Sequence, residues 1–156
     1  SPFEESGCQV RQLGGSLNIS APRQLSAVRH IRTMPYPGFP TDAQPVVMSM
    51  AAVGEGTSVF VENIFENRYR HTEGLTRMGA RIKVEGKVAV VEGVPELSGA
   101  AVEAADLRGG AALIVAGLCA RGSTRIEGTE FVKRGYEDIG EKLALLGARV
   151  KVFESC

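Results

Sequence analysis

The segment Gly79-Ala-Arg-Ile-Lys-Val84 returns almost unchanged as Gly147-Ala-Arg-Val-Lys-Val152, and a weaker copy stands at Gly7-Cys-Gln-Val-Arg-Gln12. The two strong copies follow the ends of amphipathic helical patterns, so each glycine stands where a helix commonly ends in a left-handed residue. The alternating residues after each glycine predict a strand. A repeat period of about 70 residues indicates that one supersecondary unit occurs more than once in the chain.

Two further helices are predicted at equivalent places in the repeat, over residues 46–53 and 111–120. Both stretches are apolar on nearly every side, which is typical of helices that lie inside a structure. Each is followed by a glycine turn and an alternating strand, over residues 58–62 and 124–127. The predicted unit is therefore strand, helix, strand, helix, strand, strand, in an α/β fold that has sheets outside and helices packed within.

The repeat also predicts how the chain is divided. We expect the tail of one repeat at about 1–33, a repeat at about 34–93 and a repeat at about 94–156. The chain opens inside the join between a helix and a strand. We therefore expect that its 156 residues form part of one domain in a larger protein.

The composition is that of an ordinary globular domain, with 44% hydrophobic and 23% charged residues. The 18 basic and 18 acidic side chains balance, whereas a general nucleic-acid binder is usually basic. No apolar run approaches the roughly 20 residues of a membrane-spanning helix. We therefore expect neither a nucleic acid nor a membrane as a partner.

Cysteine and histidine are too sparse for a metal site. Cys8, Cys119 and Cys156 lie far apart and form no Cys-x-x-Cys pair, so a reduced, cytosolic setting fits best. Cys119 falls in an apolar helical run and is expected to be a buried small hydrophobe. His30 and His71 are interpreted as structural or surface residues. No phosphate-loop or dinucleotide-binding glycine pattern is present, and we expect no metal and no cofactor.

The stretch Tyr36-Pro-Gly-Phe-Pro-Thr-Asp42 stands directly before the first apolar helix. Its two prolines and its glycine form a stiff turn that belongs to neither a helix nor a central strand. The turn places the Asp42 carboxylate at the start of the helix. Asp42 is either an ordinary N-cap worth about 1 kcal/mol, with Pro45 as the third helical residue, or a carboxylate aimed at a ligand.

Three arginines stand near predicted helix starts, in Glu66-Asn-Arg68, Asp106-Leu-Arg108 and Arg134-Gly-Tyr-Glu-Asp138. Asp106 is the predicted N-cap of the second apolar helix, which puts Arg108 in the first turn, where the helix dipole disfavours a cation. A helix start together with an arginine fork binds anions, so one interpretation is a phosphate or carboxylate site. The other interpretation is three weak surface ion pairs with the neighbouring acids Glu66, Asp106 and Glu137.

Four motifs occur in order along the chain: Tyr36-Pro-Gly-Phe-Pro-Thr-Asp42, Phe65-Glu-Asn-Arg68, Ala105-Asp-Leu-Arg108 and Arg134-Gly-Tyr-Glu137. Together they resemble the enolpyruvyl transferase family, and in particular its UDP-N-acetylglucosamine branch, the 1-carboxyvinyltransferases. The resemblance covers nearly the whole chain from about Met34. It implies the C-terminal part of a two-domain enzyme, with an inside-out, barrel-like α/β fold of repeated βαβαββ units.

The resemblance also implies a reaction and roles for named residues. The parent enzyme would transfer the enolpyruvyl group of phosphoenolpyruvate to the 3-hydroxyl of UDP-N-acetylglucosamine and release phosphate, in the first committed step of peptidoglycan synthesis. Asp42 matches the aspartate that hydrogen-bonds the sugar hydroxyl and takes its proton. Arg108 and Arg134 match arginines that face the phosphate and carboxylate of phosphoenolpyruvate. Four other positions match residues of the substrate cleft. Arg68 matches a third basic residue of the cleft, and Asp106 matches an acidic residue that helps to order it. Ile64 matches a position whose backbone contacts the sugar nucleotide, and Phe65 lines the cleft beside Ile64.

Two catalytic parts of the family have no match in this chain. The family's catalytic cysteine lies on a mobile loop of the other domain, and none of the three cysteines here matches its position. The family's catalytic lysine lies near the N-terminus, outside this chain. The N-terminal domain of the same protein is therefore an expected partner, and we expect no activity from the chain alone. Two alternatives stay open: an enolpyruvylshikimate phosphate synthase-like transferase, and a non-catalytic ligand-binding half-domain.

Overall fold

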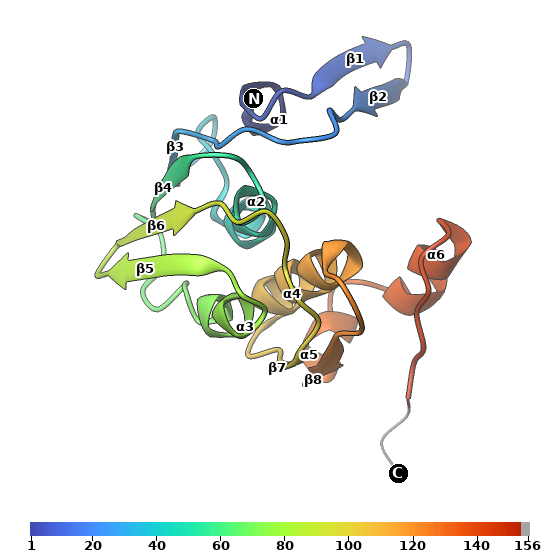
Figure 1. Cartoon of the computed structure of the whole chain (residues 1–156). Helices are drawn as coiled ribbons and strands as arrows, with labels where there is room; N and C mark the ends of the chain where they lie inside the picture. Colours follow the sequence, from blue (N-terminus) through green and yellow to red (C-terminus); the bar gives the residue numbers. More distant parts are fainter. Residues whose placement is uncertain (154–156) are drawn as a thin grey trace.

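Helices and strands alternate along most of the chain, in a computed structural model that describes residues 1–153. Cys156, one of the three cysteines considered above, lies outside the described residues. The α/β class predicted from the sequence is confirmed. Figure 1 shows an N-terminal hairpin, a central sheet with its helices, and a C-terminal group of helices with a second, smaller sheet.

The first complete unit contains one four-stranded sheet. Its strands are β3 (His30–Arg32), β4 (Thr57–Val61), β5 (Arg81–Glu85) and β6 (Val88–Glu92), in the spatial order β3-β4-β6-β5. Strands β3 and β4 are parallel, and the other two pairs are antiparallel. Helices α2 (Gln44–Ala51) and α3 (His71–Arg77) connect the strands, in the predicted order of strand, helix, strand, helix, strand, strand.

The second unit begins in the same way and ends differently. Strand β7 (Ala101–Glu103), helix α4 (Leu107–Cys119) and strand β8 (Arg125–Glu127) repeat the β3-α2-β4 arrangement, with β7 parallel to β8. Two short helices follow, α5 (Glu130–Lys133) and α6 (Ile139–Leu145). The predicted strand after Gly147 is wrong, because residues 148–153 form no strand. Within the described residues no neighbouring strand pairs with this segment as β6 pairs with β5.

The N-terminal residues form a small hairpin of their own. Helix α1 (Pro2–Glu5) leads through Gly7, at φ 92°, into the antiparallel strands β1 (Gln9–Leu13) and β2 (Ser16–Ser20). This order of helix, left-handed glycine and strand repeats that of α3, Gly79 and β5, as the weak third copy of the sequence motif predicts. Figure 1 shows the hairpin projecting away from the four-stranded sheet.

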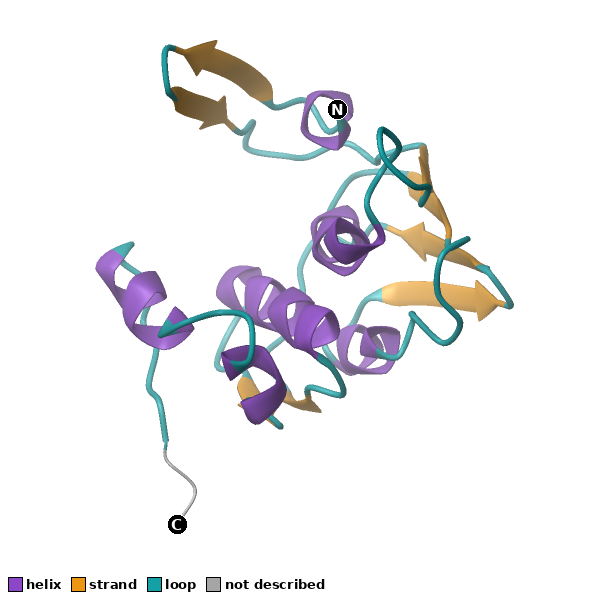
Figure 2. Cartoon of the chain, turned by 180° about the vertical axis from the view of Figure 1, so that it is seen from behind, coloured by secondary structure: helices purple, strands orange, loops and turns teal. Residues whose placement is uncertain are grey.

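The helices lie on the inner side of the sheets. Figures 1 and 2 show α2, α3 and α4 grouped beside one face of the four-stranded sheet, while β7 and β8 lie on the far side of α4. The core between these elements contains large side chains that are 0% exposed: Met48, Phe60, Leu75, Leu97 and Leu113. Burying one such side chain stabilises the fold by about 1.5–3 kcal/mol. The sheets of the described residues are open, and they close no barrel.

The two apolar helices lie inside the structure, as predicted, and they pack against each other. Ser49 in α2 donates its hydroxyl hydrogen to the carbonyl oxygen of Ala112 in α4 over 2.8 Å. The first half of α4 is buried, whereas Val115 and Leu118 in its second half are exposed. Cys119 at the end of α4 is also exposed, so the prediction of a buried residue there is wrong. Within residues 1–153, no helix is both long and apolar enough to span a membrane.

Candidate functional site

Asp42 lies in a short 3₁₀ turn directly before α2. The turn η1 (Thr41–Ala43) follows Pro40, whose backbone is extended. Helix α2 starts at Gln44 without a side-chain cap, so the alternative that Asp42 caps this helix is wrong. The reason is that the 3₁₀ turn already includes Asp42, and its carboxylate bonds to other groups. Pro45 lies in the first turn of α2, where its missing N–H costs no helical hydrogen bond.

Two arginines hold the Asp42 carboxylate. Arg68 donates from Nη2 to Oδ1 over 2.7 Å, and Arg108 donates from Nη2 to Oδ2 over 2.9 Å. Arg68 belongs to the loop after β4, and Arg108 belongs to the first turn of α4. The structure therefore brings together three of the predicted residues, from both repeat units. For these two arginines the alternative of separate ion pairs with Glu66 and Asp106 is wrong.

Asp106 caps α4, as predicted. Its carboxylate accepts a hydrogen bond from the N–H of Gly109 over 2.8 Å, which is the usual N-cap arrangement. The cap fixes the first turn of a 13-residue helix, whose N-terminus carries a partial positive charge. Arg108 adds a full positive charge at the same end, next to the Asp42 carboxylate.

The ion pairs shift the pKa values of their members. The hydrogen bond from Arg108 is the main cause that lowers the pKa of Asp42. The same bond raises the pKa of Arg108. Asp42 is therefore ionised at neutral pH, and its side chain is 54% exposed, so a ligand can reach it. Two guanidinium groups against one carboxylate leave a surplus of positive charge, which favours an anionic ligand.

Each of the three predicted arginines lies against an aromatic ring. The distances from guanidinium carbon to ring centre are 5.3 Å for Arg68 and Phe65, 5.9 Å for Arg108 and Tyr136, and 5.4 Å for Arg134 and Phe131. Stacking of this kind orients the guanidinium plane and leaves its N–H groups available for hydrogen bonds at the edge. The two phenylalanine rings therefore support Arg68 and Arg134 without taking up their hydrogen-bond donors.

Arg134 does not lie where the sequence predicted. It follows the last residue of α5 and caps the C-terminus of that helix, and α6 begins only at Ile139. The prediction of a position at a helix N-terminus is therefore wrong. The cause is Asp138, whose left-handed backbone at φ 46° stands between the two short helices. The side chain of Arg134 is exposed, and its role in binding phosphoenolpyruvate stays a prediction.

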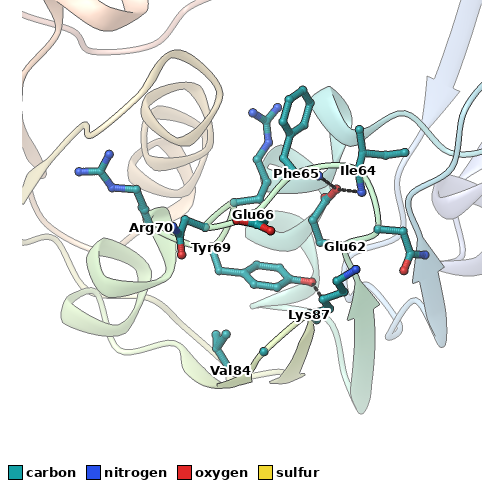
Figure 3. A pocket seen from close by; sticks show the side chains of 12 residues that line it. Glu62, Ile64, Phe65, Glu66, Tyr69, Arg70, Val84 and Lys87 are labelled. Carbon is teal, nitrogen blue, oxygen red and sulfur yellow. Dashed lines mark hydrogen bonds between the residues drawn. The ribbon is translucent and has the colours of Figure 1, made fainter.

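The loop after β4 carries Ile64, Phe65 and Arg68. These three residues line an open hollow of about 820 Å³, shown in Figure 3. The residues Ile64 and Phe65 are 39% and 55% exposed, respectively, and both line the hollow, so part of its wall is apolar. The opposite wall is formed by Val84 in β5 and by Gly86 and Lys87 in the turn between β5 and β6. The hollow therefore combines apolar and cationic groups, next to the Arg68 side of the ion-pair cluster.

Tyr69 anchors this loop to the sheet. Its hydroxyl donates toward the carbonyl oxygens of Phe60, at 3.1 Å, and Lys87, at 3.0 Å. Burial raises the pKa of Tyr69 to about 12, so the hydroxyl stays protonated at neutral pH and keeps its donor. The end of the loop is thereby tied to both β4 and the turn before β6.

Glu62 and Tyr136 were not among the residues predicted from the sequence. Glu62 is buried directly after β4, and Tyr136 packs on Arg108. A signal for Glu62 was present, because Ser58 and Phe60 face the core and alternation continues that buried face to Glu62. Tyr136 had no such signal, since its contact with Arg108 depends on how two separate segments pack.

His71 is buried at the start of α3. It is 3% exposed, and within the described residues neither ring nitrogen has a hydrogen-bond partner. Burial lowers the pKa of His71 to about 4, although the charge of Asp106 acts in the opposite direction. The ring is therefore neutral at pH 7 and fills space beside Gly109 of α4. This agrees with the interpretation of His71 as a structural residue.

Comparisons with known proteins point to one family. Residues 3–143 match the family described as EPSP synthase (3-phosphoshikimate 1-carboxyvinyltransferase). A UDP-N-acetylglucosamine 1-carboxyvinyltransferase of Desulfofundulus thermocisternus is 53% identical over 148 residues, which are 95% of this chain and 60% of that protein. UDP-N-acetylglucosamine 1-carboxyvinyltransferase 2 of Caldanaerobacter subterraneus subsp. tengcongensis is 49% identical over 150 residues, which are 96% of this chain and 36% of that protein. The chain therefore spans less than two thirds of the length of either relative, 60% of the first and 36% of the second.

Solved structures share the fold. The enolpyruvyl transferase NikO from Streptomyces tendae superposes with a TM-score of 0.84 at 28% identity, over 96% of this chain and 34% of its own. An EPSP synthase from Acinetobacter baumannii superposes with a TM-score of 0.75 at 22% identity, over 97% of this chain and 38% of its own. At that identity the second likeness shows a shared fold alone. In both cases the chain corresponds to part of a longer polypeptide.

Proposed function

The chain belongs to the EPSP synthase (3-phosphoshikimate 1-carboxyvinyltransferase) family, and on that premise we propose that it forms part of an enzyme that transfers the enolpyruvyl group of phosphoenolpyruvate. The acceptor in this proposal is the 3-hydroxyl of UDP-N-acetylglucosamine. The observation that carries the proposal is the bonding of Asp42 to both Arg68 and Arg108, three residues that the family resemblance assigns to the substrates. The relatives named for this reaction, at 45–53% identity, support the choice of acceptor.

Asp42 receives the sugar hydroxyl in the proposed reaction. Each carboxylate oxygen accepts one bond from an arginine, and a carboxylate offers about four acceptor positions in all. Asp42 can therefore accept the hydroxyl hydrogen without losing either arginine. As the hydroxyl oxygen adds to C2 of phosphoenolpyruvate, Asp42 takes the proton. Because Arg108 lowers the pKa of Asp42, the protonated carboxyl group is a strong enough acid to pass the proton on to the departing phosphate.

The remaining proton transfers take place at C3 of phosphoenolpyruvate. In the addition step C3 gains a proton from a group outside this chain. In the second step phosphate leaves C2 and C3 returns a proton to the group outside this chain that supplied it, which restores the double bond. The charges on phosphoenolpyruvate are met by Arg108 at the N-terminus of α4, and by Arg134, while Ile64 and Phe65 contact the sugar nucleotide.

The proposed reaction also implies a cellular location and a pathway for the protein. Both substrates are cytoplasmic metabolites, so the reaction would take place in the cytoplasm of a bacterium. It would be the first committed step of peptidoglycan synthesis and would support cell wall biogenesis, cell shape and cell division. The N-terminal domain of the same protein would supply the cysteine loop and the second wall of the substrate cleft.

Phosphate release by the complete enzyme tests the proposal. We expect release that requires phosphoenolpyruvate together with UDP-N-acetylglucosamine, and no release with shikimate 3-phosphate as the acceptor. Release with shikimate 3-phosphate alone would overturn the choice of acceptor in favour of the EPSP synthase reaction. Binding of UDP-N-acetylglucosamine without any phosphate release would instead support a non-catalytic binding role.

A further inference from the structure

Glu62 is an enclosed carboxylate that accepts hydrogen bonds from four donors. The residue is 2% exposed. Its Oε1 accepts from the Thr33 hydroxyl at 2.8 Å and from the backbone N–H groups of Ile64 at 2.9 Å and Phe65 at 3.1 Å. Its Oε2 accepts from the Thr41 hydroxyl at 3.0 Å. Figure 3 shows the carboxylate turned toward the backbone of Ile64 and Phe65. A buried carboxylate needs this degree of hydrogen bonding to be tolerated.

The four donors belong to three separate segments. Thr33 follows β3, and Thr41 is the residue before Asp42. The two backbone donors begin the loop that leads to Arg68. One carboxylate therefore fixes the segments that carry both partners of the 2.7 Å ion pair between Asp42 and Arg68.

We infer that Glu62 is a positioning residue, which sets the place of Asp42 relative to the loop over residues 63–70. The inference rests on the proposed function, because it concerns the placement of the proposed catalytic carboxylate. Glu62 itself is closed off from solvent and does not reach a substrate. Its four partners are neutral donors, so the positions of its oxygens matter more than its charge.

Glu62→Gln and Glu62→Asp separate position from charge. The amide oxygen of Gln can take the place of Oε1 and face the same donors, and its NH₂ group can donate to the Thr41 hydroxyl, which also accepts hydrogen bonds. Asp keeps the charge but is one methylene shorter, so its oxygens cannot reach Thr41 and the backbone of residues 64–65 together. A positioning role therefore predicts that the Gln variant works better than the Asp variant, and a role for charge predicts the reverse.

The two variants are compared by measuring kcat and KM for phosphate release by the complete enzyme. We expect Glu62→Gln to keep kcat within about fivefold and Glu62→Asp to lower kcat about 100-fold with a smaller change in KM, as when a reacting group shifts by about 1 Å. Leu97→Ala is the control for stability alone, because Leu97 is 0% exposed and lies in the core. It should lower the melting temperature and leave kcat per folded enzyme unchanged. An Asp variant at least as active as the Gln variant would overturn the inference.

Hydrogen exchange of the backbone tests the same inference without activity. In the complete enzyme, Glu62→Asp should speed the exchange of the amides of residues 64–65 about tenfold or more, whereas Glu62→Gln should change it little. Unchanged exchange in the Asp variant would overturn the positioning role, whatever the activity. Faster exchange in an enzyme whose wild type transfers no enolpyruvyl group would support the structural role of Glu62 and refute the proposed function.

Discussion

Asp42→Asn separates a catalytic carboxylate from one that only stabilises the fold. The amide oxygen of asparagine can accept from one arginine, but its NH₂ group cannot accept from the other. The side chain of Asp42 is 54% exposed, so each weakened ion pair costs at most about 1 kcal/mol of stability. Loss of a catalytic proton acceptor lowers the rate by about 10² to 10⁴, or about 3–5 kcal/mol in the activation barrier. The effect on rate should therefore exceed the effect on stability.

Steady-state phosphate release and thermal melting of the complete enzyme measure these two effects side by side. Glu73→Gln is the matched control, because Glu73 forms an exposed ion pair with Arg77 in α3 that touches no predicted site residue. This control should leave turnover unchanged. If the Asp42→Asn enzyme turned over within a few-fold of the wild-type rate, the catalytic role would be refuted. Asp42 would then be only a structural partner of Arg68 and Arg108.

Other expected outcomes concern pH, packing and the activity of the isolated chain. Burial lowers the pKa of His71 from 6.5 to about 4, so the unfolded chain takes up a proton first as the pH falls. The free energy of unfolding should therefore fall by about 3 kcal/mol between pH 6.5 and pH 4, and urea titrations that show no fall would contradict the burial of a neutral ring. Gly110→Ala would place a Cβ against Cγ2 of Val132 with too little room, so it should cost about 1–3 kcal/mol, and an unchanged urea midpoint would speak against this close packing. The chain of residues 1–156 by itself should release phosphate from the two substrates only at the background rate, and clear release would show that the cysteine-bearing domain is not required.

The ends of the helices could be predicted because they depend on local backbone geometry. Gly79 and Gly147 have φ values of 96° and 94°, and each follows a helix, as the repeated motif indicates. The capping of α4 by Asp106 could be predicted from the sequence for the same reason, since a cap involves only residues within one turn. The N-cap alternative for Asp42 failed at the same level of detail. Two helical geometries meet at this point, and the sequence pattern does not tell a 3₁₀ turn from the first turn of an α-helix.

The pairings within the candidate site could not be predicted from spacing. Arg108 stands two residues from Asp106 in the sequence, yet it bonds to Asp42 in the other unit. This choice of partner depends on how α4 packs against α2. The residues next to Asp42 and Arg108 in the sequence do not determine that packing. The burial of Glu62 follows from strand alternation, but its four donors come from segments that meet only in the folded chain. The resemblance to a known family predicted which residues belong to the candidate site, and the structure shows which of them contact one another.

The ion-pair cluster also has a consequence for the order of folding. Asp42 bonds to Arg68 across 26 residues and to Arg108 across 66 residues. Closing the longer loop costs more chain entropy, and distant contacts tend to form later. A chain in which only the first unit has formed can make the bond with Arg68 but lacks the bond with Arg108. The complete cluster thus exists only in molecules whose two units have both folded and docked, and partly folded chains lack the bond between Asp42 and Arg108.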